Sequence, residues 1–180
     1  TVPSEIQWIE RRREEMLHFW ELVENGTIPT RVTHNDTKIN NILFDKAGNV
    51  LCVIDLDTVL SSTCLNDYGD AMRSYTNTGL EDDENLDNVS MNIDIFRGYT
   101  QGYLSETAKF LNQSEIDYLA FSAKYITYEQ VLRFLMDYID GDKYYKIKYP
   151  EHNLVRTRSQ IALLRSMEDN YSRMQEIVLE

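Results

Sequence analysis

A short polar loop followed by two apolar runs is the feature that most constrains the fold of this chain. The loop spans residues 34–41 and has the pattern H-x-D-x-K-x-x-N. Apolar runs at 42–44 and 50–54 follow, and the turn between them contains Gly-Asn, so we expect a β-hairpin over residues 42–55. Strand pairing would bring Asp36 and Asn41, which precede the first strand, close to Asp55, which follows the second.

The side chains gathered in this way suit phosphoryl transfer. That chemistry needs a carboxylate to orient or deprotonate a hydroxyl, oxygen ligands for Mg²⁺ and a cation near the moving phosphate. We assign Asp36 as the base, Asn41 and Asp55 as metal ligands and Lys38 as the phosphate contact. An isolated loop Asp is usually a turn residue or a helix cap. The catalytic assignment therefore rests on the whole pattern, which has the order and spacing of the protein-kinase motif H-R-D-x-x-x-x-N followed by a metal-binding Asp.

The rest of the chain is predicted to be helical, which makes the fold class mainly α with a small central β-hairpin (α+β). Apolar residues recur at helical spacing in several segments, and capping residues or glycines stand near their ends. Arg11, Arg12 and Arg13 lie among glutamates, so we expect a solvated face with local ion pairs there. Cys52, in the middle of a strand, is expected to be a small buried hydrophobe. The expected helices span residues 3–25, 67–76, 89–105, 114–140 and 153–180.

Four stretches resemble the aminoglycoside phosphotransferase and choline kinase superfamily, and within it most closely the N-acetylhexosamine 1-kinase group. The stretches 31–38 (RVTHNDTK) and 53–58 (VIDLDT) are specific for the superfamily. The stretches 67–73 (DYGDAMR) and 141–145 (GDKYY) indicate the group and are weaker evidence. Asn35 follows His34, where protein kinases have Arg, and Asp55-Leu56-Asp57 replaces Asp-Phe-Gly. These differences are typical of kinases that phosphorylate small molecules.

The resemblance implies a protein-kinase-like fold and ATP-dependent transfer to a small-molecule hydroxyl, with Mg²⁺ as cofactor. The implied acceptor is the anomeric hydroxyl of an N-acetylhexosamine, which would give a sugar 1-phosphate. In this superfamily the residue matching His34 holds the loop, and we expect the same here. Asp57 is either a further metal ligand or a cap for the segment that follows, since Asp favours both roles.

Three further residues are candidates for substrate binding, each with a structural alternative. Arg73 either faces the active site or pairs with Asp70 or Asp67 on the same predicted helix. Tyr144 belongs to an aromatic, basic loop at 143–152, and tyrosine rings suit the face of a sugar.

The third candidate, Arg133, lies within the predicted helix 114–140. Glu129 and Asp137 stand four residues to either side, so a ladder of ion pairs on the helix surface is the structural alternative. A guanidinium that faces the substrate is the functional one.

The sequence also predicts which part of a kinase this chain represents. Kinases of this superfamily have an N-terminal lobe with a phosphate-covering loop and a strand lysine. Only 33 residues precede the loop at 34–41, and the seven glycines form no Gly-rich loop after a strand. We therefore expect residues 1–180 to be a single domain, a C-terminal lobe whose N-lobe is absent. Alone it should be inactive, and it should self-associate through the apolar surface near the hairpin and the first helix that the N-lobe would otherwise cover.

Composition limits the alternatives. A hydrophobic content of 42% indicates a globular chain, and no apolar run approaches the ~20 residues of a membrane helix. The net charge of −12 argues against nucleic acid as a partner. Two cysteines without a C-x-x-C motif, and no secretory signal, favour a cytoplasmic location. Choline, homoserine or an aminoglycoside remain alternative acceptors, and a non-catalytic binding module remains an alternative function. Neither Cys begins C-x-P-x-R, so a sulfatase is disfavoured.

Overall fold

The computed structural model describes residues 2–180 and confirms a mainly helical fold with small antiparallel sheets. The strands form two separate pairs, β1 with β4 and β2 with β3. The helices are α1 (Pro3–Glu10), α2 (Arg13–Glu24), α3 (Cys64–Tyr75), α4 (Ile93–Thr107), α5 (Gln113–Asp117), α6 (Leu119–Ile139), α7 (His152–Asp169) and α8 (Tyr171–Leu179). The strands are β1 (Arg31–Thr33), β2 (Ile42–Phe44), β3 (Val50–Val53) and β4 (Leu60–Ser62).

The core lies around α6, which packs against both α3 and α7. Its buried residues face several directions, as the nearly continuous apolar sequence predicts. The approach of α3 depends on Gly69, because a Cβ there would stand 2.4 Å from the Ser122 carbonyl oxygen of α6. The helix that carries Asp67, Asp70 and Arg73 is therefore held at a fixed place against the core. Among the helices of residues 2–180, none is both long and apolar enough to cross a bilayer.

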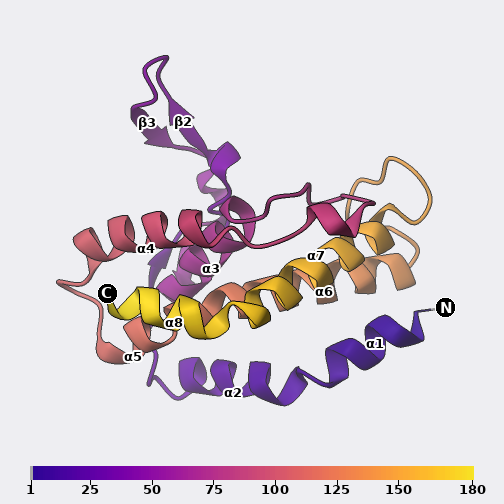
Figure 1. Cartoon of the computed structure of the whole chain (residues 1–180), viewed down its shortest axis with the longest axis horizontal. Helices are drawn as coiled ribbons and strands as arrows, with labels where there is room; N and C mark the ends of the chain where they lie inside the picture. The colour runs from indigo at the N-terminus through magenta and orange to yellow at the C-terminus, as the bar shows by residue number, and fades with distance from the viewer. Residues whose placement is uncertain (1) are drawn as a thin grey trace.

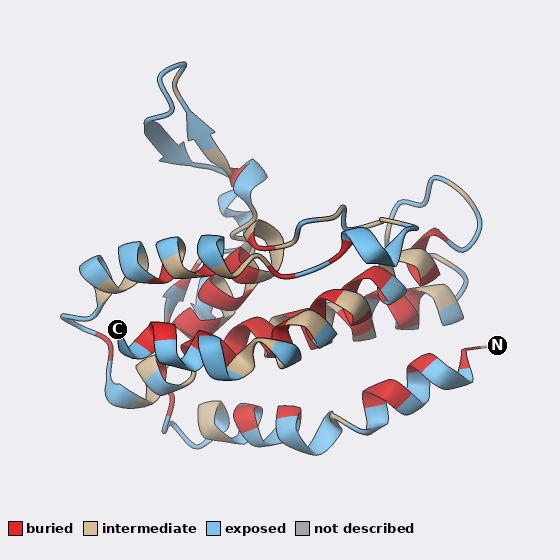
Figure 2. Cartoon of the chain, viewed as in Figure 1, coloured by how far each residue is buried: buried red, intermediate tan, exposed pale blue. Residues whose placement is uncertain are grey.

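The hairpin formed by β2 and β3 projects from the helical body, as Figure 1 shows. All four residues of β3 are exposed, as Figure 2 shows, and Val50 and Leu51 are each 63% exposed. The hairpin is therefore peripheral within the described chain, although we predicted it to be central. The expectation that Cys52 is buried is wrong for the same reason, since the helical body does not cover β3.

The predicted first helix is in fact two, α1 and α2, and the break falls at the arginines. Arg12 donates two 2.7 Å hydrogen bonds to the Glu168 carboxylate of α7 and stacks over the Trp8 ring at 4.0 Å. Arg13 does pair locally, with Glu10 at 3.4 Å. Local spacing could not predict the partner of Arg12, because that partner is distant in the sequence.

The two predicted C-terminal helices are also divided. The segment 114–140 becomes α5 and α6, and the segment 153–180 becomes α7 and α8. The cap of α5 is Asn112, which forms a capping box with Glu115. Glu115 is buried and also receives two hydrogen bonds from Arg31 of β1, which tie α5 to the strand before the polar loop.

Candidate active site

Two carboxylates of α3 hold the backbone of the polar loop at 34–41. Asp67 accepts hydrogen bonds from the backbone N–H groups of His34 and Asn35 at 2.8 and 2.6 Å. Asp70 accepts one from the Thr37 N–H at 2.9 Å. Asn35 has a positive φ of 62°, which Asn tolerates better than most residues. The loop conformation is therefore fixed by α3, which is in turn fixed against α6.

The loop is also tied to the segment that follows the hairpin. The Thr58 hydroxyl donates to the His34 carbonyl oxygen at 2.6 Å, and the Asn35 amide donates to the Thr58 carbonyl oxygen at 3.2 Å. The His34 ring Nε2 lies 2.9 Å from the Ile54 carbonyl oxygen, the structural type of contact that we expected for this residue. These bonds set the loop against the segment that carries Asp55.

The Asp36 carboxylate receives two side-chain hydrogen bonds on the same oxygen. Lys38 Nζ donates to Asp36 Oδ2 at 2.7 Å and Asn41 Nδ2 donates to it at 2.9 Å. Burial would raise the pKa of Asp36, but these two donors outweigh it and lower the pKa. The same contact with Asp36 raises the pKa of Lys38. The structure therefore keeps Asp36 ionised, with its other oxygen free of these donors.

Asp55 and Asp57 lie next to each other after β3. Asp55 has a left-handed backbone (φ 64°), and the Asn41 carbonyl oxygen accepts from the Ile54 N–H at 2.9 Å, which sets Asn41 beside this segment. Hydrogen bonding to Asp57 and its negative charge raise the pKa of Asp55, and the charge of Asp36 adds to the effect. The 3₁₀ turn Leu56–Thr58 has no side-chain cap, and α3, the next helix, is capped by Thr63.

The residues that we assigned to Mg²⁺ have the right chemistry for it. Asn41 turns its NH₂ group toward Asp36, which leaves its Oδ1 as an oxygen donor. Two adjacent carboxylates repel each other, and a divalent cation between them would relieve that repulsion. Within residues 2–180 no three His, Cys, Asp or Glu side chains form a metal cluster by themselves. The Asn41 oxygen is the further protein ligand that we assign beside the two carboxylates.

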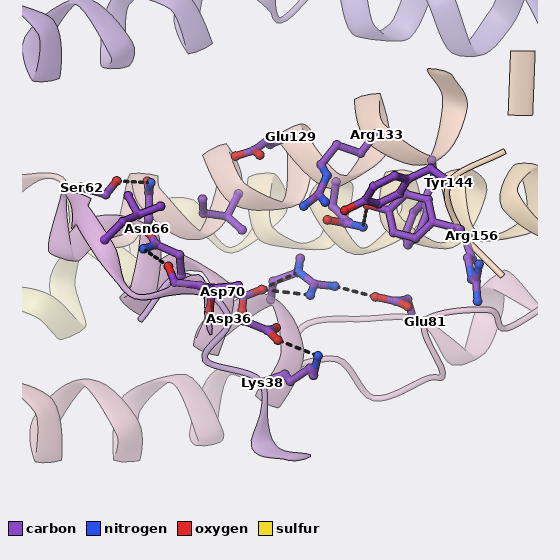
Figure 3. A pocket seen from close by; sticks show the side chains of 18 residues that line it. Asp36, Lys38, Ser62, Asn66, Asp70, Glu81, Glu129, Arg133, Tyr144 and Arg156 are labelled. Atoms are coloured by element: carbon purple, nitrogen blue, oxygen red, sulfur yellow. Dashed lines mark hydrogen bonds and ion pairs between the residues drawn. The ribbon is translucent and has the colours of Figure 1, made fainter. Parts of the chain in front are cut away.

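A cavity of about 640 Å³ opens beside Asp36 and Lys38. Figure 3 shows Asp36, Lys38 and Asp70 near one side and Arg133, Tyr144 and Arg156 toward the other. All three substrate-binding candidates, Arg73, Arg133 and Tyr144, line the cavity, whereas the metal candidates Asn41, Asp55 and Asp57 do not.

Arg73 occupies its structural alternative. It donates to Asp70 Oδ1 at 2.9 and 3.1 Å and to Glu81 Oε1 at 2.9 Å, and its side chain is only 12% exposed. Its charge is therefore already matched by two carboxylates. This arginine lines the wall of the cavity but is the least available of the cations in it.

Of the two alternatives for Arg133, the ion-pair ladder does not form among the described residues. Its guanidinium lies over the Tyr145 ring at 5.6 Å. Asp137, the expected partner, is buried and instead accepts from the backbone N–H groups of Lys143, Tyr144 and Tyr145 at 2.8–2.9 Å. Asn153 of α7 donates to the same carboxylate at 2.8 Å. Asp137 thus holds the aromatic loop against the helices and is a site residue that local spacing misassigned.

A second carboxylate, which the sequence did not indicate as a site residue, connects the aromatic loop to the acidic loop 81–84. Asp82, in the acidic loop 81–84, accepts from Lys148 Nζ at 2.8 Å and lies 2.9 Å from the buried His152 ring. These contacts lower the pKa of Asp82 to about 2, with the Lys148 bond as the largest cause. The signal in the sequence was present only as an acidic run, which usually means a solvated loop.

The chain matches the APH phosphotransferase enzyme family over residues 2–105, which is more than half of its length. It belongs to that family. Family members are kinases that typically use ATP and Mg²⁺ and act on small molecules. The match includes the polar loop, the hairpin and α3, whereas Arg133, Tyr144 and the loop held by Asp137 lie beyond it.

Proposed function

We propose that this chain supplies the catalytic base and the acceptor site of a kinase that transfers the γ-phosphoryl group of ATP to a hydroxyl of a small molecule. The observation that carries the proposal is the Asp36 carboxylate, held by Lys38 and Asn41 at the edge of the cavity. Family membership supports the reaction class, and the geometry supports this assignment of roles.

In this proposal each residue has one task. Asp36 accepts a hydrogen bond from the acceptor hydroxyl and takes its proton as the new O–P bond forms. Lys38, at 2.7 Å from Asp36, places a positive charge where the phosphoryl group moves. Asn41, Asp55 and Asp57 would hold Mg²⁺. Such an ion would supply positive charge that offsets the negative charge developing on the phosphoryl group.

For the acceptor we propose a sugar, with the anomeric hydroxyl of an N-acetylhexosamine as the position phosphorylated. The cavity is lined by polar side chains and by Tyr144, whose exposed ring can pack on a sugar ring. A quaternary ammonium such as choline would need free aromatic faces. The Tyr145 face is taken by Arg133, which argues against choline and against polycationic aminoglycosides.

We further propose that a nucleotide-binding lobe covers the hairpin face in the active protein. Support comes from the cluster of exposed apolar side chains there, including Val50, Leu51 and Leu56 at 61–63% exposure. The 180-residue chain alone should then show no ATP turnover and should self-associate at high concentration. Robust turnover by this chain, or a monomer at every concentration in light scattering, would contradict this part.

The test of the function is an acceptor panel. A protein that contains this chain together with a nucleotide-binding lobe is incubated with ATP, Mg²⁺ and N-acetylhexosamines, neutral hexoses, choline, homoserine or an aminoglycoside, and products are followed by phosphorus NMR. We expect a sugar 1-phosphate. Product on choline or an aminoglycoside alone would overturn the acceptor, and no product with any hydroxyl compound would favour a non-catalytic binding module.

A further inference from the structure

Thr37 lies in the polar loop between the proposed base Asp36 and the proposed phosphate contact Lys38. Asp36 and Lys38 both line the cavity (Figure 3), and their side chains contact each other at 2.7 Å. Residues two apart lie on one side of an extended backbone, and Lys38 has the extended values φ −60° and ψ 150°. The side chain between them points the opposite way, which for Thr37 is toward α3.

The backbone and the side chain of Thr37 are all hydrogen-bonded to α3. Its N–H donates to Asp70 Oδ2 at 2.9 Å, and its hydroxyl donates to the Asp67 carbonyl oxygen at 2.6 Å. Its carbonyl oxygen accepts from the Tyr75 hydroxyl at 2.6 Å. Thr37 therefore cannot rotate or slide along α3 without breaking at least one of these three bonds.

Two of these partners are held in place by their own neighbours. Asp70 Oδ1 accepts from Arg73 Nε and Nη2 at 3.1 and 2.9 Å, and Oδ2 accepts from the Thr37 N–H. The Tyr75 ring packs edge-on against Tyr99 of α4, with 5.5 Å between the ring centroids. Burial raises the pKa of Tyr75 to about 12, so its hydroxyl keeps the proton that it donates. The contacts of Thr37 are therefore supported by packing on the α3 side of the loop.

We propose that Thr37, bound by Asp70 and Tyr75, is a positioning residue that directs Asp36 and Lys38 into the cavity. This deepens the proposed kinase function and rests on it. A twist of the backbone at Thr37 would turn both neighbours away from the cavity together. Neither Thr37 nor Tyr75 lines the cavity, so weakening their contact should slow phosphoryl transfer and leave acceptor affinity nearly unchanged.

Steady-state kinetics of a protein that contains this chain together with a nucleotide-binding lobe tests this role. Tyr75→Phe removes the bond to the Thr37 carbonyl oxygen, and Thr37→Val removes the bond to the Asp67 carbonyl oxygen. Each should lower kcat about ten- to a hundredfold and leave KM for the acceptor within about twofold. Thr37→Ser keeps the hydroxyl and should keep kcat close to that of the unsubstituted protein.

Tyr99→Phe is the matched control. Its ring packs beside Tyr75, and among the described residues its hydroxyl makes no hydrogen bond to the polar loop. Hydrogen exchange of the 180-residue chain, read by mass spectrometry at low concentration, gives a readout that needs no activity. Exchange over residues 34–38 should become about two- to tenfold faster in Tyr75→Phe and stay unchanged in Tyr99→Phe. Circular dichroism checks that both variants keep the fold.

Three results would overturn the proposal. The first is an equal loss of kcat in Tyr75→Phe and Tyr99→Phe. The second is a rise in KM without a loss of kcat, and the third is unchanged exchange over residues 34–38 in Tyr75→Phe. If the unsubstituted protein transfers no phosphate but exchange responds as expected, the proposed function is wrong and the hold of Tyr75 on the loop stands.

Discussion

On both sides of the cavity, a helix carboxylate accepts hydrogen bonds from the backbone N–H groups of a loop. On one side Asp67 captures the backbone N–H groups of the polar loop, and on the other Asp137 captures those of the aromatic loop. The polar loop has further anchors in Asp70, Thr58 and Tyr75, whose hydroxyl donates to the Thr37 carbonyl oxygen at 2.6 Å. The polar-loop side is therefore held along its whole length.

The aromatic loop has its strongest anchor at one end, where Asp137 accepts three backbone N–H groups. Beyond Asp137, its tip is tied by the ion pair of Lys148 with Asp82, in which Lys148 is 70% exposed, and Tyr144 is itself 76% exposed. Exposed ion pairs contribute little, typically about 0–1 kcal/mol. The catalytic carboxylate Asp36 is therefore positioned by rigid contacts. The aromatic loop, which forms the opposite wall of the cavity, can adapt or vary without disturbing Asp36.

The largest effect should come from Asp36→Asn in a protein that includes the nucleotide-binding lobe. The amide keeps the shape of the carboxylate but cannot take the hydroxyl proton, so kcat should fall ~10²–10⁴-fold. KM for the sugar should change little, because an amide oxygen still accepts from the hydroxyl. Steady-state kinetics measures both constants. Near-normal kcat would remove Asp36 as the base.

The paired variants Asp67→Ala and Asp137→Ala test the comparison itself. Each removes a carboxylate that holds backbone N–H groups, and each should lower stability by ~1–3 kcal/mol in urea unfolding. Asp67→Ala should mainly lower kcat, by up to ~10²-fold, because the base is misplaced. Asp137→Ala should mainly raise KM for the acceptor, by about tenfold as an order of magnitude. If both variants changed the same constant, the two sides would not act separately.

Asn41→Asp tests how Asn41 affects the pKa of Asp36 and the binding of Mg²⁺ on the polar-loop side. It replaces a donor to Asp36 with a second negative charge, and both changes raise the pKa of Asp36 above its present lowered value. Because the ionised base is the active form, activity is lost as pH falls through that pKa. The acid limb of the kcat–pH profile should therefore move to higher pH, while the Mg²⁺ concentration needed should change as well. An unchanged acid limb and unchanged Mg²⁺ dependence would contradict the site.

The smallest effect should come from Asp82→Asn, which removes the ion pair with Lys148 at the tip of the aromatic loop. Its pKa is lowered to about 2 from an ordinary 3.8, so its stabilisation is fully present above about pH 4 and is lost as pH falls toward 2. The wild-type protein should lose more stability than the variant over that range in urea unfolding. Asp87→Asn, at an exposed position without a side-chain partner among the described residues, is the control. Parallel pH curves for wild type and Asp82→Asn would show that the pair contributes nothing.

Much of the polar-loop side could be predicted from the sequence, because its parts are close together along the chain. The predicted hairpin forms, and the structure pairs Asn41 with Asp36 and with Ile54, the residue before Asp55. The positions of most helices also followed from apolar spacing. Their breaks, as at Arg12, did not, since they depend on partners as distant as Glu168.

The contacts of Arg133 and of the aromatic loop could be determined only from the tertiary structure. Helical spacing paired Arg133 with Asp137, but burial against α7 made that carboxylate more stable on three backbone N–H groups and Asn153 than on a guanidinium four residues away. Arg133 instead stacks on Tyr145, and Arg156 stacks on Phe134. Sequence spacing determines which side chains share a helix face. Only packing decides which of the available donors is buried with a given acceptor, because the cost of leaving a buried polar group unpaired exceeds the gain from a surface ion pair.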